Sequence, residues 1–191
     1  TNTPRTPSVP GLSFIRQTYT NTYRLQTISG NWTNASEGFL QTTETGDHQL
    51  GIPNVRYASF RIEATLKNET GSGSSGIAFD KKNFDDAFDS AYSLRYTSDK
   101  KLLFCHKSNL IATIDISGMP DELRVVADYK NGVFTVYAGD DATPVYTRTL
   151  KLTNDGFVSF YTSGVTARVM NFNVHTYGAT LYSSISSIES S

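Results

Sequence analysis

The sequence predicts an all-β protein, a two-sheet antiparallel β-sandwich of the jelly-roll type. Two observations predict it. Segments in which apolar and polar residues alternate, the period of a half-buried strand, follow one another along most of the chain, and turn residues separate each segment from the next. No stretch shows a convincing helical period. About twelve strands without helices fit a two-sheet sandwich best, with a closed barrel as the second choice.

In the first half of the chain, strands are predicted wherever a run rich in aromatic and β-branched residues lies between turn residues. The longest, residues 55–66 (VRYASFRIEATL), places Phe60, Ile62 and Ala64 on one face. The run GSGSSG after it is predicted as a flexible turn leading into residues 75–80 (SGIAFD). The other strands predicted in this half are residues 23–28, 37–43 and 48–52.

Residues 81–93 (KKNFDDAFDSAYS) have a weak helical spacing, because Phe84 and Phe88 lie four residues apart. The stretch is short and aspartates surround both rings, so a loop that crosses between strands is predicted. The aspartates of this loop are expected to form a solvated acidic surface.

The clearest hairpin of the chain is residues 122–139 (ELRVVADYKNGVFTVYAG). Asn131 and Gly132 supply the positive φ angles that a tight hairpin turn requires. Asp140 and Asp141, which follow it, are predicted to make turn hydrogen bonds. The remaining strands are predicted at residues 91–98, 100–107, 110–116, 145–152, 156–163 and 165–178.

The chain of 191 residues divides into one domain with a tail at each end. Residues 1–22 are a Pro/Thr-rich linker that leads into the domain, residues 23–177 are the β-sandwich, and residues 178–191 are a Ser-rich tail. Such tails are typical of linkers between the modules of exported proteins. We therefore expect a secreted or cell-surface protein, a monomer within a larger multidomain chain.

Composition excludes several classes of partner and site. The net charge is −1, so no basic field favours nucleic acid or an anionic membrane. Cys105 is the only cysteine and lies in an apolar run, so no internal disulfide exists and a buried thiol is predicted. The three histidines share no ligand spacing with Cys105, and no zinc site is predicted.

The motifs of hydrolytic and phosphate-binding enzymes are missing from the sequence. It contains no E-x-D-x-x-E array of the glucanase kind and no G-x-S-x-G elbow. The GSGSSG run has no lysine and no helix after it, so it is not a phosphate-binding loop. We expect a protein without catalytic residues of its own.

Strand alternation predicts a second, polar face on the middle strands. When the apolar residues of the strands at 55–66, 91–98 and 122–130 point inward, planar hydrogen-bonding groups point outward. Arginine and carboxylate groups can clamp the vicinal hydroxyls of a sugar with paired hydrogen bonds. The same residues can instead serve solubility and cross-strand pairing. The outward residues are Arg61, Glu63, Arg95, Arg124 and Asp128.

An aromatic ring can cover the apolar face of a bound sugar. The rings proposed for this task are Tyr161, Tyr137 and Trp32, although a core or edge position is an alternative for Trp32. One tryptophan suits a shallow pocket for a chain end better than a flat platform for a long chain. Tyr92, Tyr96 and Tyr129 are expected in the core.

The order of these motifs carries a resemblance. A tryptophan strand, a GFL strand, a long amphipathic strand, a GIAF strand, a YSLRY strand, the LRVVADYKNGVFTVYAGD hairpin and a GFVSFYTSGVTARVMNFNV ending follow one another. This order resembles the concanavalin A-like lectin/glucanase sandwich. Within it, residues 23–177 are similar to the fructan-binding modules of levanases and to the C-terminal sandwich domain of glycoside hydrolase family 32.

Two positions depart from the family pattern. Asp80 stands where members commonly have an arginine, and we expect it among the ligand-binding residues. Met170 stands in place of the aspartate of a Phe-Asp-Asn element. A structural calcium that the resemblance makes possible is therefore not favoured, since a thioether is a poor ligand for a hard cation. No other cofactor or metal is expected.

The resemblance implies a non-catalytic carbohydrate-binding module of an exported polysaccharide-active enzyme, with a fructan as one candidate ligand. The expected partner is a poly- or oligosaccharide. Three alternatives stay open: a lectin-like adhesin domain of a surface protein, a structural sandwich that braces a catalytic domain, and a small glycosidase.

Overall fold

The computed structural model describes residues 14–17, 22–140, 142–153 and 155–181. Throughout these ranges the regular secondary structure is β-strand, and none of it is a helix long and apolar enough to cross a membrane. The strands are β1 (Phe14–Gln17), β2 (Thr22–Thr27), β3 (Trp32–Ala35), β4 (Gly38–Gln41), β5 (Asp47–Gly51), β6 (Val55–Lys81), β7 (Tyr92–Thr97), β8 (Leu102–His106), β9 (Asn109–Ile114), β10 (Leu123–Lys130), β11 (Val133–Ala138), β12 (Tyr146–Thr149) and β13 (Phe157–Leu181).

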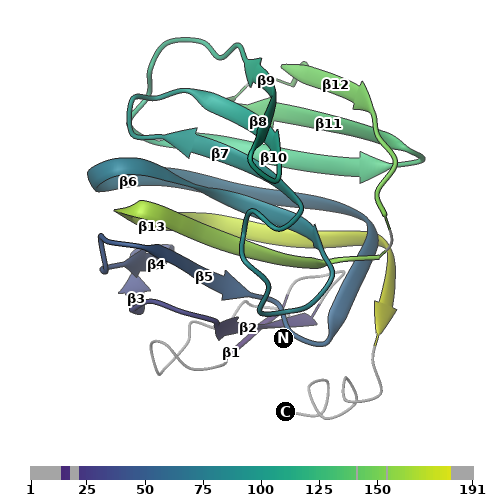
Figure 1. The fold of residues 1–191 in the computed structure, drawn as a ribbon, viewed down its shortest axis with the longest axis horizontal. Helices are drawn as coiled ribbons and strands as arrows, with labels where there is room; N and C mark the ends of the chain where they lie inside the picture. Colours follow the sequence, from purple (N-terminus) through teal and green to yellow (C-terminus); the bar gives the residue numbers. More distant parts are fainter. Residues whose placement is uncertain (1–13, 18–21, 141, 154, 182–191) are drawn as a thin grey trace.

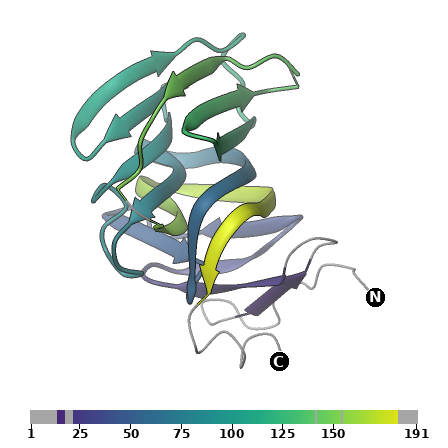
Figure 2. The same cartoon turned by 90° about the vertical axis from the view of Figure 1, so that its right-hand side faces the viewer.

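Two long strands, β6 and β13, belong to both layers of a sandwich (Figures 1 and 2). The first half of β6 and the last half of β13 form sheet I, in the order β12-β11-β10-β6-β13-β4-β3. The second half of β6 and the first half of β13 form sheet II, in the order β9-β8-β7-β6-β13-β5-β2-β1. All pairings are antiparallel, as predicted for a two-sheet sandwich.

The Gly/Ser run in the middle of β6 differs from its prediction as a turn. The strand stays paired with β13 while it bends from sheet I to sheet II. Glycine permits this bend, because Gly71 has a φ of 95° and a Cβ on Gly73 would lie 1.8 Å from the carbonyl oxygen of Ser163. The segments predicted as separate strands at 156–163 and 165–178 likewise form the single strand β13, with Gly164 at its bend.

The core lies between the two sheets and follows the predicted alternation. Phe60, Ile62 and Ala64 of β6 are at most 1% exposed. Sheet II faces them with Phe79, whose ring centroid lies 5.3 Å from that of Phe60, and with Phe104. Tyr96 and Tyr129 are also buried, Tyr92 is half-buried against the core, and Cys105 is a buried free thiol, as expected.

The predicted hairpin joins β10 to β11, and its turn residues Asn131 and Gly132 have φ angles of 53° and 75°. Residues 82–91 form the predicted loop, without a helix. The strand β1 lies within the segment assigned to the leading linker, and β13 runs past Tyr177 to Leu181. The antiparallel sandwich itself is confirmed.

Candidate functional site

Polar side chains gather on the outer face of sheet I, where β6, β10 and β11 lie side by side. The register sets Arg61 opposite Asp128, and it sets Val126 between Glu63 and Tyr137. Each strand thus sends alternate residues outward, and the antiparallel pairing places those residues on neighbouring rungs. We call the outward residues of these strands, together with Tyr177 of the neighbouring strand β13, the polar face; it consists of Arg61, Glu63, Arg124, Asp128, Tyr137 and Tyr177.

One corner of the polar face is a cluster around Asp128. Its Oδ2 lies 3.2 Å from Nη1 of Arg61 and accepts a hydrogen bond from the hydroxyl of Tyr177 at 2.7 Å. The guanidinium carbon of Arg61 lies 5.2 Å from the ring centroid of Tyr137, and the amine of Lys130 lies 4.8 Å from that of Tyr177. Partial burial and the hydrogen bond to Asp128 raise the pKa of Tyr177.

The other corner is built around Arg124. Its Nε donates to Oε2 of Glu63 at 2.6 Å, and its Nη1 donates to the carbonyl oxygen of Gly139 at 3.3 Å. A guanidinium has five N–H donors. The Nη2 group of Arg124 makes no hydrogen bond to any residue in the described ranges, so donors remain for a ligand.

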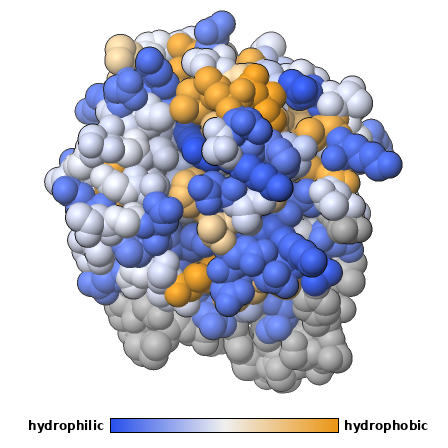
Figure 3. Space-filling view, in the orientation of Figure 1, coloured by the Kyte–Doolittle hydropathy of each residue, from blue (hydrophilic) through white to orange (hydrophobic). Residues whose placement is uncertain are grey.

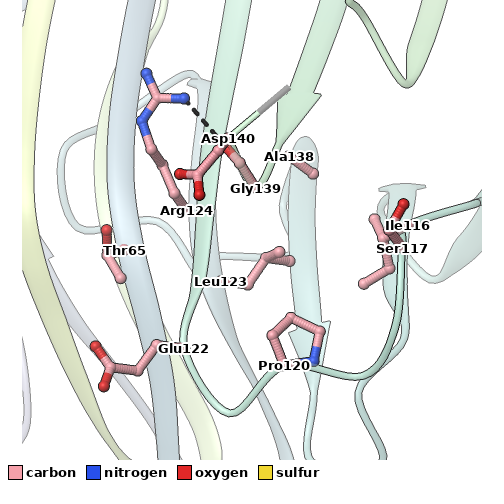
Figure 4. Close-up of a pocket in the computed structure, with 10 residues that line it drawn as sticks. All are labelled: Thr65, Ile116, Ser117, Pro120, Glu122, Leu123, Arg124, Ala138, Gly139 and Asp140. Carbon is pink, nitrogen blue, oxygen red and sulfur yellow. Dashed lines mark hydrogen bonds between the residues drawn. The ribbon is translucent and has the colours of Figure 1, made fainter. Parts of the chain in front are cut away.

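Two hollows meet at this corner. The first, of about 580 Å³, lies between β10, β11 and the loop at 115–122, and its walls include Thr65, Ser117, Pro120 and Leu123 (Figure 4). The second, of about 460 Å³, is lined by Arg61, Tyr137 and Ala142. Both hollows share Arg124 and Asp140 as walls, so they are neighbours along the sheet.

Asp140 was predicted to make turn hydrogen bonds, and that prediction is wrong within the described part of the chain. Its carboxylate is exposed and has no side-chain hydrogen bond or ion pair to any residue described there; Asp141 lies outside those ranges. Glu122, also exposed, stands at the first hollow with no ion pair to the described residues. The junction of the hollows therefore offers the free acceptors of Asp140 beside the free donors of Arg124, and the first hollow adds those of Glu122.

Arg95 does not belong to the polar face, which corrects the prediction of one common patch. It points outward from β7, as alternation predicts, but β7 lies in sheet II. Its Nε donates to Oγ of Ser93 and its Nη2 to the carbonyl oxygen of Lys107, both at 2.8 Å. The ring of Phe88, from the loop at 82–91, lies 5.1 Å from its guanidinium carbon.

Tyr161 and Trp32 are also misplaced as sugar-binding rings. Tyr161 is fully buried, because Phe88 covers it and its hydroxyl is hydrogen-bonded to Oγ of Ser74 at 2.8 Å. Trp32 is fully buried in the core, and its indole N–H donates to the carbonyl oxygen of Ser29 at 2.9 Å. The core alternative given for Trp32 is therefore the correct one.

Asp80 lies away from the polar face, at the end of β6 in sheet II. It is 9% exposed, has a φ of 62°, and accepts a hydrogen bond from the backbone N–H of Thr153 at 3.1 Å. It lines a separate hollow of about 390 Å³ together with Arg56, Lys82 and His106.

Of the predicted site residues, the structure brings together Arg61, Glu63, Asp128, Arg124 and Tyr137.

The sequence reading missed Tyr177, Asp140 and Glu122 as residues of the site. Tyr177 had a signal, since it follows His175 by two positions on a strand with outward odd-numbered residues. The two carboxylates had a signal as well, since Glu122 and Asp140 stand at the two ends of the predicted hairpin, which antiparallel pairing brings together.

The face drawn in Figure 3 is mainly hydrophilic, with hydrophobic residues gathered toward its top, where Figure 1 shows β8 and β9. The edge strand β9 carries Leu110, which is 56% exposed. In the described part of the chain, no group of three or more His, Cys, Asp or Glu residues is placed to hold a metal ion.

Comparison with known proteins supports the fold. No protein family profile matches the chain, and no curated protein sequence is similar to it. Among solved structures, the carbohydrate-binding module CBM66 from Bacillus subtilis is similar at a TM-score of 0.60 and 14% identity, over 80% of this chain and 95% of that one. The exoplasmic/lumenal domain of VIP36 with calcium and mannose bound has a TM-score of 0.61 at 8% identity, over 84% and 85%.

A sialidase is similar over 80% of this chain and 17% of its own length, with a TM-score of 0.60 and 14% identity. At these identities the likeness concerns the fold. The predicted concanavalin A-like sandwich is thereby confirmed.

Proposed function

We propose that this protein is a non-catalytic carbohydrate-binding module that holds a polysaccharide on the polar face of sheet I. The observation that carries the proposal is the pair of adjoining hollows. Arg124 keeps free donors and Asp140 keeps free acceptors at their shared wall, and Tyr137 presents a ring in the second hollow. Solved structures with this fold include a carbohydrate-binding module and the exoplasmic/lumenal domain of VIP36 in a mannose-bound form, which supports the same proposal.

The chemistry of the face suits sugar hydroxyls. A hydroxyl both donates and accepts, so two neighbouring hydroxyls can accept from a guanidinium and donate to a carboxylate at once. The ring of Tyr137 covers the apolar C–H face of the sugar. The ion pairs of Arg61 with Asp128 and of Arg124 with Glu63 hold these side chains in place before the ligand arrives, which reduces the entropy lost on binding.

The ion pairs also argue against a hydrolytic role for Glu63 and Asp128. A glycosidase needs a carboxylic acid that donates a proton to the glycosidic oxygen and a second carboxylate across the bond. Glu63 and Asp128 are each bonded to an arginine, so neither is placed as a free proton donor. We infer that the domain anchors a larger exported enzyme to its polysaccharide and raises the local substrate concentration. A fructan is the first candidate, from the resemblance to levanase modules.

The proposal is tested by affinity electrophoresis of the full chain in gels that contain levan, inulin, xylan, mixed-linkage β-glucan or mannan. Retarded migration in at least one gel is expected, without release of reducing sugar after prolonged incubation. The Arg124→Ala and Tyr137→Ala variants are expected to weaken retardation at least about tenfold, the effect of losing charge-assisted hydrogen bonds or a stacked ring.

Arg95→Ala is the matched control. It removes an arginine of similar exposure from sheet II, so the variant is expected to bind like the wild type. Uniform migration of the wild type in all gels would overturn the proposal. Retardation in the levan and inulin gels alone would identify a fructan, and retardation elsewhere would exclude it as the preferred ligand.

A further inference from the structure

The two hollows on sheet I differ in chemistry although they share a wall. The second hollow is aromatic and cationic, with Tyr137 and Arg61. The first is bounded by Pro120 and Leu123 and carries the free carboxylate of Glu122. A single sugar ring can occupy only one of these environments, because Arg124 and Asp140 form the wall that the two hollows share. Figure 4 shows these two residues at the first hollow.

From this division we infer that the site binds the interior of a neutral glycan chain, with at least one sugar unit in each hollow and the linkage held at Arg124 and Asp140. The inference rests on the proposed function and changes it in one respect: the shallow chain-end pocket expected from the sequence becomes a groove with two occupied positions. Each hollow, at about 580 and 460 Å³, has the size of a small-molecule site by itself.

The charges select a neutral chain. The guanidinium groups of Arg61 and Arg124 are already paired with carboxylates, whereas Glu122 and Asp140 have no cationic partner among the residues described. A uronic acid or sulfated unit in the first hollow would bring like charges together. Hydroxyl groups instead donate to these carboxylates, which strengthens the hydrogen bonds.

Chain length is the variable that tests the groove. Isothermal titration of the full chain is carried out with the mono-, di-, tri- and tetrasaccharides of the inulin, xylan and mannan series. For the series that binds, affinity is expected to rise at least about tenfold from the monosaccharide to the trisaccharide. Equal affinity for all lengths would overturn the groove while leaving the proposed function intact.

A variant that fills only the first hollow gives the second test. Ser117 is exposed and lines that hollow, so Ser117→Trp narrows it without entering the core, and Ser117→Ala is the matched control. Ser117→Trp is expected to lower trisaccharide affinity to that of the monosaccharide and to leave monosaccharide affinity unchanged. Unchanged trisaccharide affinity in a folded Ser117→Trp variant would overturn the inference.

Charge selection is tested with tri-galacturonate beside the neutral trisaccharides. Binding to tri-galacturonate is expected to be at least about tenfold weaker, and Glu122→Gln is expected to narrow that gap. Tighter binding of tri-galacturonate would overturn the neutral-chain assignment. If no saccharide of any series binds and no polysaccharide gel retards the protein, the proposed function itself fails. Failure of the groove alone would instead leave carbohydrate binding intact.

Discussion

The ring of Phe88 lies flat on the ring of Tyr161, with centroids 3.9 Å apart and planes 6° apart. Phe88 belongs to the loop at 82–91, and Tyr161 belongs to the part of β13 in sheet II. The loop therefore covers the outer face of sheet II with an aromatic contact, and burial there raises the pKa of the Tyr161 hydroxyl. This contact removes the ring of Tyr161 from the outer surface of sheet II.

The Phe88→Ala variant is expected to lose stability without losing carbohydrate binding. Removing a buried aromatic ring costs about 3 kcal/mol in the free energy of unfolding, and Phe88 is 4% exposed. Urea denaturation measures the loss, and the polysaccharide gels measure binding. Phe88→Leu, which keeps most of the apolar contact, should lose less stability. If folded Phe88→Ala were retarded less than the wild type in the gels, part of the binding site would lie on sheet II.

A buried lysine beneath the same loop predicts a pH dependence of stability. Nζ of Lys81 donates to Oε1 of Gln49 at 2.8 Å and to the carbonyl oxygen of Phe84 at 2.7 Å, and the side chain is fully buried. Burial lowers the pKa of Lys81 from 10.5 to about 8. Between these values the unfolded chain binds more protons than the folded protein, so stability rises with pH across this window, by about 3 kcal/mol.

The measurement is urea denaturation at pH values from 7 to 10.5 for the wild type and for Lys81→Met. The variant retains every tyrosine, so the difference between the two curves isolates the lysine. We expect the wild type to gain stability relative to Lys81→Met as the pH rises through 8. Parallel curves over the whole range would show that Lys81 titrates as it does in the unfolded chain.

The bend of β6 predicts a strong effect of a single methyl group. A Cβ on Gly73 would lie 1.8 Å from the carbonyl oxygen of Ser163, which is backbone and cannot rotate away. Gly73→Ala is expected to destabilise the protein by more than about 2 kcal/mol, measured by thermal or urea denaturation. Gly118→Ala is a useful comparison, since a Cβ there meets no atom within 4 Å. Its left-handed φ of 71° alone predicts a loss of about 1–2 kcal/mol, so Gly73→Ala, which adds a clash with backbone, should lose more.

The hydrogen bonds around Asp128 predict a binding effect at the aromatic hollow. Asp128→Asn keeps the shape of the side chain but removes the charge that holds Arg61 over Tyr137. We expect affinity for the bound glycan to fall about three- to tenfold, because the guanidinium is no longer held in place. Asp99→Asn is the control, since Asp99 is an exposed carboxylate paired with Lys101. Titration calorimetry measures the glycan affinity of both variants. An equal loss of affinity in both would show that Asp128 does not position Arg61 for the ligand.

Local pattern was enough to predict which side of a strand each residue occupies. Arg61, Glu63, Arg124 and Asp128 point outward, and Arg95 does too, because the two-residue period of a strand fixes the direction of its side chains. The hairpin turn at Asn131 was likewise predictable from backbone preference alone.

The period does not say to which sheet a strand belongs. Arg95 separates from Arg61 because β6 bends between them, and that bend depends on the approach of Gly73 to Ser163, residues far apart in the sequence. Tyr161 was misjudged for a similar reason, since only tertiary packing brings Phe88 over it. Asp140 and Glu122 line one hollow because they flank the β10–β11 hairpin, but the loop at 115–122 that closes the hollow is not encoded by any strand pattern.

Because β6 and β13 run through both layers and pair with each other along most of their lengths, a single β6–β13 ladder of hydrogen bonds connects the two sheets. The β6–β13 ladder joins residues about a hundred positions apart, so it can form only after most of the chain has been synthesised. Folding should therefore be slow. A protein divided at residue 90 would separate the two halves of this ladder, and neither fragment should fold alone. When the two fragments are mixed, they should either assemble into the complete sandwich or both stay unfolded.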